Sequence, residues 1–351
     1  MQVAIDATPL TAPNSGIARY VRELTCALVE HFPEDQFTLV SDQPFQSPCG
    51  AARGRGPGNV LERRWWLYGV QRELSRCGGQ VFHGTHFTVP WLPLRPSVMT
   101  IHDMSPWLDP RWDSGAAFVR RRTPYLVGLG VATRIITPTE AVRREVLTRF
   151  RVPSDRVRAV PHAASACFRP VPAAPRCAPY FLCVSSVEPR KNVDMLVAAW
   201  REVHRLYGIE LVLVGPSRKG FLAPPPEPGL HSRGEVADAE LSTLYSSAVA
   251  VLYPSHYEGF GFPVLEAMQC GALVIASRDP AIREVAAEAA LLLDSDDALA
   301  WTAAMEAAAT HRDPLNQLRA RALERARHFS WARTAKSTRD VYFEAIRTFR
   351  E

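Results

Sequence analysis

The stretch between Tyr253 and Ser277 constrains the fold more than any other part of this 351-residue chain. An apolar run that ends at Tyr253 is typical of a buried strand, and it leads into a loop with two glycines. Pro263 suits the first turn of a helix, where its missing N–H is not needed, and Gly271 is placed to end that helix. A second apolar run, 272–276, follows. The stretch therefore predicts a strand, a loop, a helix and a second strand in succession.

The loop of this unit, 258–262, has the features of an anion site. A helix N-terminus presents N–H groups and a positive dipole, and glycines let the backbone approach a ligand closely. Glu258 and Glu266 flank the helix start. Glu266 could accept hydrogen bonds from vicinal hydroxyls while the backbone holds a phosphate, so the suggested ligand is a nucleotide sugar. The alternative interpretation is a helix whose acidic first turn is stabilised by the dipole.

The full order of this stretch, E-G-F-G-F-P-x-L-E-A-M-x-x-G between two apolar strands, is far more specific than either glutamate alone. It resembles the signature of the retaining, nucleotide-sugar-dependent glycosyltransferases of family four, whose fold is called GT-B. In that family the E-x7-E pair contacts the donor, which implies that Glu258 faces the sugar and Glu266 faces the ribose. The resemblance implies further donor contacts from Gly259, Phe260, Gly261 and Leu265.

A second junction of strand and helix carries two cations. The predicted strand 180–184 leads into S-S-V-E-P-R-K-N and then a helix over 193–206. Arg190 offers a planar fork and Lys191 a point charge, and a departing diphosphate needs such groups where no metal stabilises it. E-P-R-K-N resembles the family sequence, which implies that both cations bind phosphate and that Ser186 lies on the donor side. In relatives the segment equivalent to 230–236 touches the nucleobase, which implies a donor contact from Val236. The alternative is a basic loop that caps the helix.

The first half alternates strands with helices, which predicts one parallel sheet layered with helices. Gly16 lies in a loop before the helix 17–31, where N–H groups could bind phosphate, and the family has a second glycine where Ala18 stands. His102 and Asp103 follow the strand 97–101, at the strand end where open α/β sheets place ligand residues. Relatives carry T-x-H-D here, so His102 is expected to face the donor sugar or leaving phosphate. Asp103 is expected to support the acceptor side.

The proline-rich segment after His162 marks the expected boundary between two domains. We expect a first domain over 1–168, a linker over 169–178 and a second domain over 179–333. The GT-B resemblance implies two Rossmann-like domains that face each other across a cleft, with a last helix, 334–351, that crosses back to the first domain. In relatives, N-G-V-D or H-G-V-D stands where this chain has H-A-A-S from His162.

The composition is that of a globular protein and excludes a disordered one. Apolar residues make up 47% of the chain and charged residues 22%. The seven cysteines are odd in number and form no C-x-x-C, which predicts reduced thiols in a cytoplasmic protein and no zinc site. We expect no signal peptide and no membrane-spanning segment. The apparent D-x-D at Asp294 follows a predicted strand in an acidic run, which indicates a turn and a helix cap, so we expect no metal.

The net charge of +5 is uneven, because arginines exceed acidic residues in the first half. A nucleic-acid partner would fit a basic half, but no helix-turn-helix, zinc or RNA-binding signature supports it. An anionic membrane surface or a phosphate-bearing acceptor fits better, and scattered solvated arginines are the third interpretation. The basic-aromatic segment 61–67 could lie at a lipid interface or bury its tryptophans in the core, and the core is favoured.

These features predict transfer of a hexose, with retention and without a metal, from a nucleotide sugar to a hydroxyl of a glycan or lipid-linked acceptor in cell-surface polysaccharide synthesis. GDP-mannose is favoured over a UDP-sugar. The alternatives are a non-catalytic nucleotide-sugar-binding subunit and a UDP-sugar-dependent enzyme with a small acceptor. A phosphorylase would need a pyridoxal-bound lysine, and Lys191 already has a role among the few lysines. The expected location is the cytoplasm or the inner face of the membrane.

Overall fold

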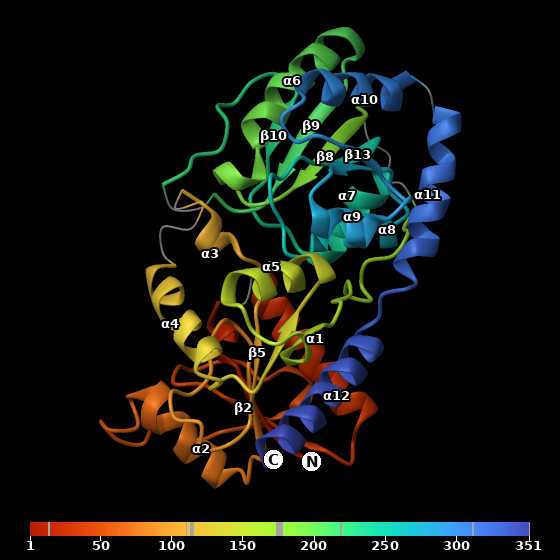
Figure 1. Cartoon of the computed structure of the whole chain (residues 1–351). Helices are drawn as coiled ribbons and strands as arrows, with labels where there is room; N and C mark the ends of the chain where they lie inside the picture. Colours follow the sequence, from red (N-terminus) through yellow and green to blue (C-terminus); the bar gives the residue numbers. More distant parts are fainter. Residues whose placement is uncertain are drawn as a thin grey trace. The chain divides into compact units, whose positions relative to one another are not determined.

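The computed structural model describes residues 1–12, 15–109, 111–112, 116–172, 178–217, 220–310 and 312–350, with side chains omitted at 312–316 and 350. The chain divides into two compact units (Figure 1). The first comprises Met1–His162 and Ser330–Glu351, and the second comprises Ala163–Phe329. Residues 173–177 of the predicted linker lie outside the described residues. So do Gly115, at the expected start of a helix, and two residues named from the sequence, Cys177 and Lys219.

The described part of the first unit contains a parallel seven-stranded sheet in the order β3-β2-β1-β4-β5-β6-β7. Its strands are β1 Gln2–Asp6, β2 Gln36–Val40, β3 Ala52–Arg53, β4 Val81–Gly84, β5 Ser97–Thr100, β6 Arg134–Thr137 and β7 Val157–Ala159. Its helices are α1 Gly16–His31, α2 Val70–Arg76, α3 Ser105–Leu108, α4 Ala117–Gly128, α5 Glu140–Phe150 and α12 Trp331–Arg350. Shorter 3₁₀ turns lie at Thr8–Thr11 (η1), Pro48–Gly50 (η2) and Ser154–Arg156 (η4).

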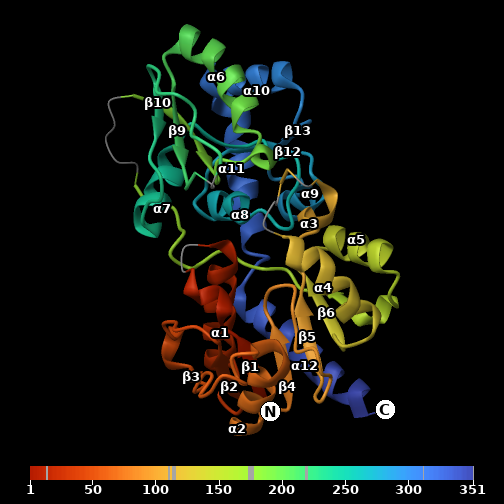
Figure 2. The same cartoon turned by 90° about the vertical axis from the view of Figure 1, so that its left-hand side faces the viewer.

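The second unit repeats the design with a parallel sheet in the order β10-β9-β8-β11-β12-β13 (Figure 2). Its strands are β8 Tyr180–Val184, β9 Glu210–Val214, β10 Leu230–Ser232, β11 Ala250–Tyr253, β12 Val274–Ser277 and β13 Leu291–Leu293. Its helices are α6 Val193–Tyr207, α7 Asp238–Ser247, α8 Phe262–Gln269, α9 Pro280–Ala286, α10 Ala298–Thr310 and α11 Arg312–Ala326. A 3₁₀ turn, η5 Pro189–Lys191, links β8 to α6.

Strand β8 shows why this sheet is covered on both faces. Successive side chains of a strand point to opposite faces. Leu182 and Val184 pack with α7 and α8 in one core, whereas Phe181 and Cys183 pack with α6 and α10 in the other. A strand buried on both sides needs an unbroken apolar run, and the sequence supplies one over 180–184. The second core contains the fully buried indoles of Trp200 and Trp301.

The last helix, α12, belongs to the first unit. It packs along α1 (Figure 1). The phenol of Tyr342 on α12 forms a hydrogen bond with the Nδ1 of His83 at 2.7 Å. Arg339 donates to Asp35 at 2.6 Å, and Arg134 donates to Thr348 at 2.6 Å. These polar contacts attach the end of the chain to its first sheet.

The second unit begins at Ala163, several residues before the segment that the sequence assigns to a linker. The side chain of Phe168 is fully buried in the core of the second unit and meets the ring of Tyr245 at a centroid distance of 5.9 Å. The amide of Gln269 donates to the carbonyl oxygens of Ser165 and Phe168 at 2.9 and 2.7 Å. Apolar burial of Phe168 therefore attaches this segment to the second sheet.

Local signals predicted the main helix ends well. The Thr139 side chain caps α5 by accepting a hydrogen bond from the N–H of Val142 at 3.2 Å, as expected for a threonine that precedes a helix. The basic-aromatic segment 61–67 leads into a π-helical turn, η3 Trp65–Gly69, before α2. Trp65 is buried, in agreement with the core interpretation of this segment. Within the described residues, every helix is too short or too polar to span a membrane.

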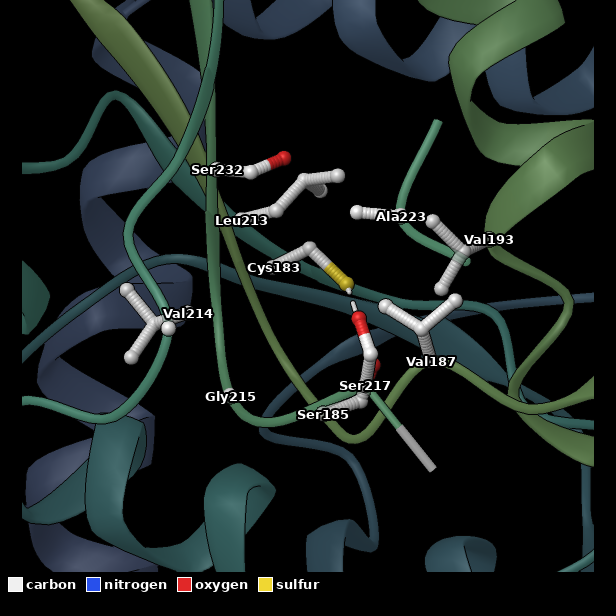
Figure 3. Close-up of a pocket in the computed structure, with 11 residues that line it drawn as sticks. Cys183, Ser185, Val187, Val193, Leu213, Val214, Gly215, Ser217, Ala223 and Ser232 are labelled. Atoms are coloured by element: carbon white, nitrogen blue, oxygen red, sulfur yellow. Dashed lines mark hydrogen bonds between the residues drawn. The ribbon is translucent and has the colours of Figure 1, made fainter. Parts of the chain in front are cut away.

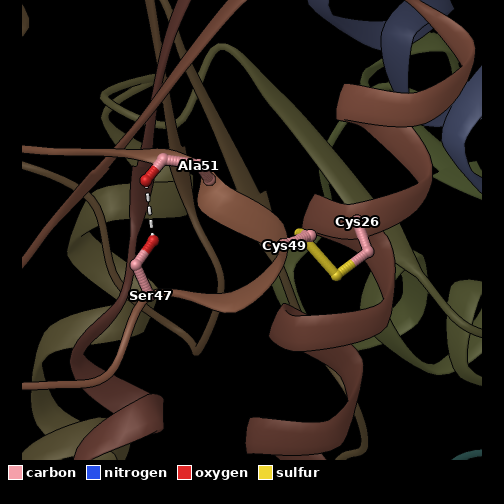
Figure 4. The surroundings of a disulfide bond; sticks show 4 residues. All are labelled: Cys26, Ser47, Cys49 and Ala51. Atoms are coloured by element: carbon pink, nitrogen blue, oxygen red, sulfur yellow. Dashed lines mark hydrogen bonds between the residues drawn. A yellow bond between two sulfur atoms is a disulfide. The ribbon is translucent and has the colours of Figure 1, made fainter.

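The prediction that the cysteines are all reduced is wrong. Cys26 on α1 and Cys49 in η2 form a disulfide, with 5.5 Å between their Cα atoms (Figure 4). The segment after β2 contains η2 and then β3, which pairs with β2, so that η2 lies beside α1. Spacing along the chain carried no sign of this contact, because the packing of η2 on α1 brings the two thiols together.

Replacing Cys49 with serine should destabilise the first unit by about 3 kcal/mol in oxidising buffer, because the closed loop restricts the unfolded chain. The sequence separation of 23 residues sets this estimate. Urea unfolding with and without reductant measures the effect, and Cys167→Ser is the matched control at an exposed thiol. Reductant should remove the difference between Cys49→Ser and the parent protein. Equal midpoints in oxidising buffer would contradict the role of this disulfide.

Candidate functional site

The predicted strand–loop–helix–strand unit is present as β11, the loop 254–261, α8 and β12. Gly261 caps α8 with a φ of +86°, a conformation that favours glycine, and Pro263 lies in the first turn. Gly271 follows the helix with a φ of +72°. The N-terminus of α8 therefore lies at the carboxyl end of a buried parallel strand, where open α/β sheets bind ligands.

Glu258 lies in this loop and is buried, with 7% of its surface exposed. The ammonium group of Lys191 donates to its Oε1 at 2.5 Å, and the phenol of Tyr253 donates to the same oxygen at 3.0 Å. Arg190 places its Nη1 3.2 Å from the Oε2 of Glu258. The structure thus brings together three residues that the sequence predicted in two separate segments.

Arg190 and Lys191 are positioned by the turn η5 between β8 and α6. Arg190 also donates to the carboxylate of Glu188 at 3.0 Å and to the carbonyl oxygen of Tyr257 at 2.7 Å. Ser186 donates to the same carboxylate oxygen of Glu188 at 3.2 Å. Strands β8 and β11 are neighbours in the sheet, so their carboxyl ends meet and their loops can exchange these contacts.

Burial and charge act against each other on these groups. Burial alone would raise the pKa of Glu258, but the charges of Lys191 and Arg190 outweigh it and lower that pKa to about 2. Burial, followed by the neighbouring charge of Arg190, lowers the pKa of Lys191, although Glu258 acts in the opposite direction. Glu258 is therefore an anion at neutral pH, held between two cations.

Asp279 is a site residue that the sequence prediction missed. Its Oδ1 caps α9 by accepting from the N–H groups of Ala281 and Ile282 at 2.9 and 3.1 Å. Its Oδ2 accepts from the N–H of Glu258 at 3.2 Å. Burial raises the pKa of Asp279 to about 7, with a smaller contribution from the charge of Glu258. Its position just after β12 was the available signal, because polar residues at strand ends are where such sheets place their sites.

Glu266 lies in the second turn of α8 and is buried. Its Oε2 accepts a hydrogen bond from the phenol of Tyr245 on α7 at 3.0 Å. This partner differs from those of Glu258, so the two glutamates occupy separate electrostatic surroundings on one loop and helix. The Tyr245 phenol therefore fixes the position of one oxygen of this carboxylate.

The side chains of Phe260 and Leu265 point into the core of the second unit. Phe260 packs against the rings of Phe262 and Phe329, with centroid distances of 5.3 and 6.0 Å. Leu265 is fully buried. Any donor contact from these two residues would therefore come from the backbone, as for Gly259 and Gly261. Val236 is partly buried against the same core.

A pocket lies at the carboxyl ends of β8, β9 and β10 (Figure 3). Gly215 is required there, because its φ is +136° and a Cβ atom would lie 2.2 Å from the carbonyl oxygen of Ser185. The hydroxyl of Ser185 lies 3.8 Å from the thiol of Cys183. The sequence prediction named only Ser186 and Val236, which lie near these lining residues in the sequence. Other lining residues include Val187, Val193, Leu213, Ser217, Ser232 and Gly234.

His102 belongs to the first unit, where its Nε2 donates to the carbonyl oxygen of Thr85 at 2.8 Å. A carbonyl oxygen only accepts, so the proton is on Nε2 and Nδ1 is an acceptor. Burial, followed by the nearby His86, lowers the pKa of His102 to about 4. The imidazole is therefore neutral at physiological pH, and its edge contacts the ring of Tyr20 at a centroid distance of 4.9 Å.

Asp103 and Gly16 occupy helix starts of the first unit. The Oδ1 of Asp103 accepts from the N–H and the hydroxyl of Ser105 at 2.9 and 2.6 Å, which fixes the start of α3. Gly16 is the first residue of α1, and Ser15 caps that helix through the N–H of Ala18 at 3.0 Å. Both residues thus have a local structural role, and their ligand roles stay predictions.

The apparent D-x-D forms a turn and a cap, as predicted. Asp294 accepts from the N–H of Asp296 at 3.0 Å, and Asp297 accepts from the N–H of Ala300 at 3.0 Å in the first turn of α10. In the part of the chain that the structure describes, no group of three or more His, Cys, Asp or Glu residues is arranged to hold a metal ion.

Replacing Glu258 with glutamine should destabilise the second unit by about 3 kcal/mol, because it leaves the buried ammonium group of Lys191 without its carboxylate. Urea unfolding followed by the fluorescence of the buried Trp200 measures this loss. Glu202→Gln is the control, since Glu202 pairs with Arg205 on the exposed face of α6 at 2.9 Å. The control should cost less than about 1 kcal/mol. A similar loss in both variants would show that burial of the Glu258 pair is not what stabilises the loop.

Two family models match the chain, one on each unit. The model described as Glycosyltransferase Family 4 matches residues 14–165, and the model described as Glycosyl transferases group 1 matches residues 178–311. Together these segments account for most of the chain.

Relatives and solved structures extend over both segments. The chain is 29% identical to O-antigen chain mannosyltransferase B of Escherichia coli, over 97% of this chain and 99% of that protein. It is 27% identical to O-antigen chain mannosyltransferase RfbU of Salmonella typhimurium, over 69% of each. Sucrose-phosphate synthase from Thermosynechococcus elongatus has a similar structure, with a TM-score of 0.78 and 20% identity over 99% of this chain and 100% of that chain. The chain therefore belongs to the family-four glycosyltransferases, and its two Rossmann-like units are those of the GT-B fold.

Proposed function

We propose that this glycosyltransferase moves a hexose, with retention and without a metal, from a nucleotide sugar to a hydroxyl of a glycan or lipid-linked acceptor in cell-surface polysaccharide synthesis. The observation that carries the donor assignment is the ion-pair cluster of Arg190, Lys191 and Glu258, which lies after the carboxyl ends of β8 and β11. The names of the O-antigen mannosyltransferases support the polysaccharide and mannose as the hexose. The donor that we propose is GDP-mannose.

The cluster supplies the charge that a departing diphosphate needs. Arg190 is paired with Glu188 and Glu258, and Lys191 is paired with Glu258. A diphosphate would compete for these cations, and the N–H groups at the start of α8 would add to its stabilisation. Because cations and amides suffice to stabilise the leaving group in this scheme, we propose that no metal is required.

Glu258 and Glu266 would then bind hydroxyls of the donor. Glu258 lies between the two cations and would orient the sugar as the diphosphate binds beside it. Glu266 has the Tyr245 phenol as a fixed partner, which holds the carboxylate in place to accept from the ribose hydroxyls. The pocket at the carboxyl ends of β8, β9 and β10 is the proposed place for the nucleobase of the donor. It lies at the same edge of the sheet as the loops that carry Lys191 and Glu258.

His102 would contact the donor sugar rather than the leaving phosphate. Its imidazole is neutral, and its Nε2 proton is already donated to Thr85. The remaining Nδ1 is an acceptor, which suits a sugar hydroxyl and not a phosphate oxygen. The leaving phosphate would itself take the proton of the acceptor hydroxyl. Asp103 would keep the start of α3 in place on the acceptor side.

Binding of GDP, UDP, ADP and their sugars tests the donor assignment directly. The matching nucleotide at about 100 times its dissociation constant should stabilise the protein by about 2.7 kcal/mol, which raises the melting temperature. Glu266→Ala should weaken binding by about 1.5–3 kcal/mol, because a hydrogen bond to a charged acceptor is lost. Glu324→Ala, at an exposed pair on α11, should leave binding unchanged. Unchanged affinity in Glu266→Ala would exclude the ribose role.

The same nucleotide sugar then tests the reaction. Release of a nucleoside diphosphate in the presence of acceptor would distinguish an enzyme from a non-catalytic binding subunit. The anomeric configuration of the product, read by NMR, should match that of the donor. Activity should persist when a metal chelator is present. A product with the opposite anomeric configuration would contradict retention, and loss of activity in the chelator would contradict metal independence.

We also propose peripheral binding of the first unit to an anionic membrane surface. Val60 and Leu61 are exposed at 81% and 58%, and the exposed arginines Arg63 and Arg64 follow them directly. Apolar side chains beside cations favour a lipid interface.

The protein should float with anionic liposomes at low salt and less at moderate salt, because the charge contribution is screened. The double variant Arg63→Glu, Arg64→Glu should float less, whereas Arg201→Glu on the exposed face of α6 should float like the parent. Failure of the parent protein to float at either salt concentration would exclude this membrane role.

A further inference from the structure

Another pocket lies in the first unit, and its lining includes none of the residues assigned above to donor binding. It lies beyond the carboxyl ends of β1 and β4, and α4 forms one wall of it. Its lining combines aromatic rings with a few polar groups. The lining residues that matter here are Asp6, Trp66, Phe87, Thr88, Phe118 and Arg122.

Arg122 is a buried cation in this pocket. Only 4% of its surface is exposed, and its Nη1 has no hydrogen-bond partner among the described residues. The guanidinium lies over the rings of Trp66 and Phe118, at 4.8 and 4.7 Å from their centroids. These rings hold the faces of the guanidinium and leave its N–H edge for a different partner.

A second polar group of the lining is also without a partner. The hydroxyl of Thr88 is buried and makes no hydrogen bond to the described part of the chain. The carboxylate of Asp6 accepts from the N–H and hydroxyl of Thr8, at 3.1 and 2.7 Å. Asp6 influences Arg122 only through its longer-range charge, and the structure records no ion pair between them. The pocket therefore contains a cation that no neighbouring carboxylate neutralises.

An unpaired buried charge is costly, so a protein rarely keeps one without a use for it. A guanidinium fork matches the geometry of a carboxylate or phosphate, and it keeps its proton even when it is buried. The ring of Phe87 and the other aromatic walls suit the carbon framework of a sugar. The hydroxyl of Thr88 and the carboxylate of Asp6 suit its hydroxyl groups.

We propose that this pocket is an acceptor subsite, in which Arg122 binds the oxyanion of an acidic sugar, a carboxylate or a phosphate, and Thr88 and Asp6 bind its hydroxyls. The word acceptor rests on the proposed glycosyl transfer, whereas the binding of an acidic sugar rests on this pocket alone.

Calorimetry with the full chain tests the binding of glucuronate, glucose 6-phosphate, glucose and inorganic phosphate. At least one acidic sugar should bind about tenfold more tightly than glucose, since a charge-assisted contact is gained. Comparison of the two acidic sugars tells which oxyanion the pocket accepts. Arg122→Gln should weaken that binding about tenfold or more. Thr88→Val should weaken it less, through loss of one hydroxyl.

The matched control is Arg121→Gln, which removes the same charge from the adjacent, exposed position. It should bind the acidic sugar like the parent protein. The proposal would be overturned by any of three results. These are equal affinity for glucose and both acidic sugars, equal loss of acidic-sugar affinity in Arg121→Gln and Arg122→Gln, and no binding of any sugar. Inorganic phosphate that binds as tightly as glucose 6-phosphate would overturn the sugar part of it.

Nucleotide binding in the second unit keeps the outcomes separable. A nucleotide-induced rise in melting temperature in Arg122→Gln shows that the variant is folded. If that variant does not fold, Arg122→Lys keeps the charge without the fork and should still bind the acidic sugar less tightly. Acidic-sugar binding through Arg122 without any nucleotide binding would remove the proposed transfer and leave this site. Nucleotide binding without acidic-sugar binding would remove the Arg122 site and leave the proposed transfer.

Discussion

The buried ion pair between Lys191 and Glu258 is the contact on which the arrangement of the second unit's candidate site depends. It joins the turn after β8 to the loop after β11, two neighbouring strands whose loops lie 67 residues apart in sequence. Two buried charges must contact each other closely to offset their loss of hydration. Arg190 and Asp279 extend the contact to both carboxylate oxygens and to the backbone of the loop. The loop conformation and the charge of the site are therefore determined together.

The two candidate sites treat their buried polar groups differently. In the cluster of Arg190, Lys191 and Glu258, cations and a carboxylate are paired, so an anionic ligand would exchange with partners that are already present. In the first unit, burial keeps His102 neutral, because an imidazole loses its proton readily. Arg122 cannot respond in this way, since a guanidinium stays charged, and its partner must come from elsewhere. This difference supports a donor site in one unit and an acceptor subsite in the other.

Much of the fold could be predicted because its signals are local. The apolar run over 180–184, the cap at Thr139 and the glycine that ends α8 each lie within a few residues of the element they define. Strand β3 and helix α9 were missed because both are short. The first is held by pairing with β2, and the second by the Asp279 cap that also binds the Glu258 loop. The disulfide between Cys26 and Cys49 was missed because the packing of η2 on α1 creates it.

The sequence alone determined the two parallel α/β units, the resemblance to family four and the residues from which a donor site could be built. Only the tertiary structure decided how those residues are partnered. Glu258 lies between Arg190 and Lys191, while Glu266 is held by Tyr245. The pocket around Arg122 has no counterpart in any sequence pattern. The physical reason is that periodicity and capping act over one or two turns of chain, whereas ion pairs, disulfides and pockets depend on which distant strands and helices lie side by side.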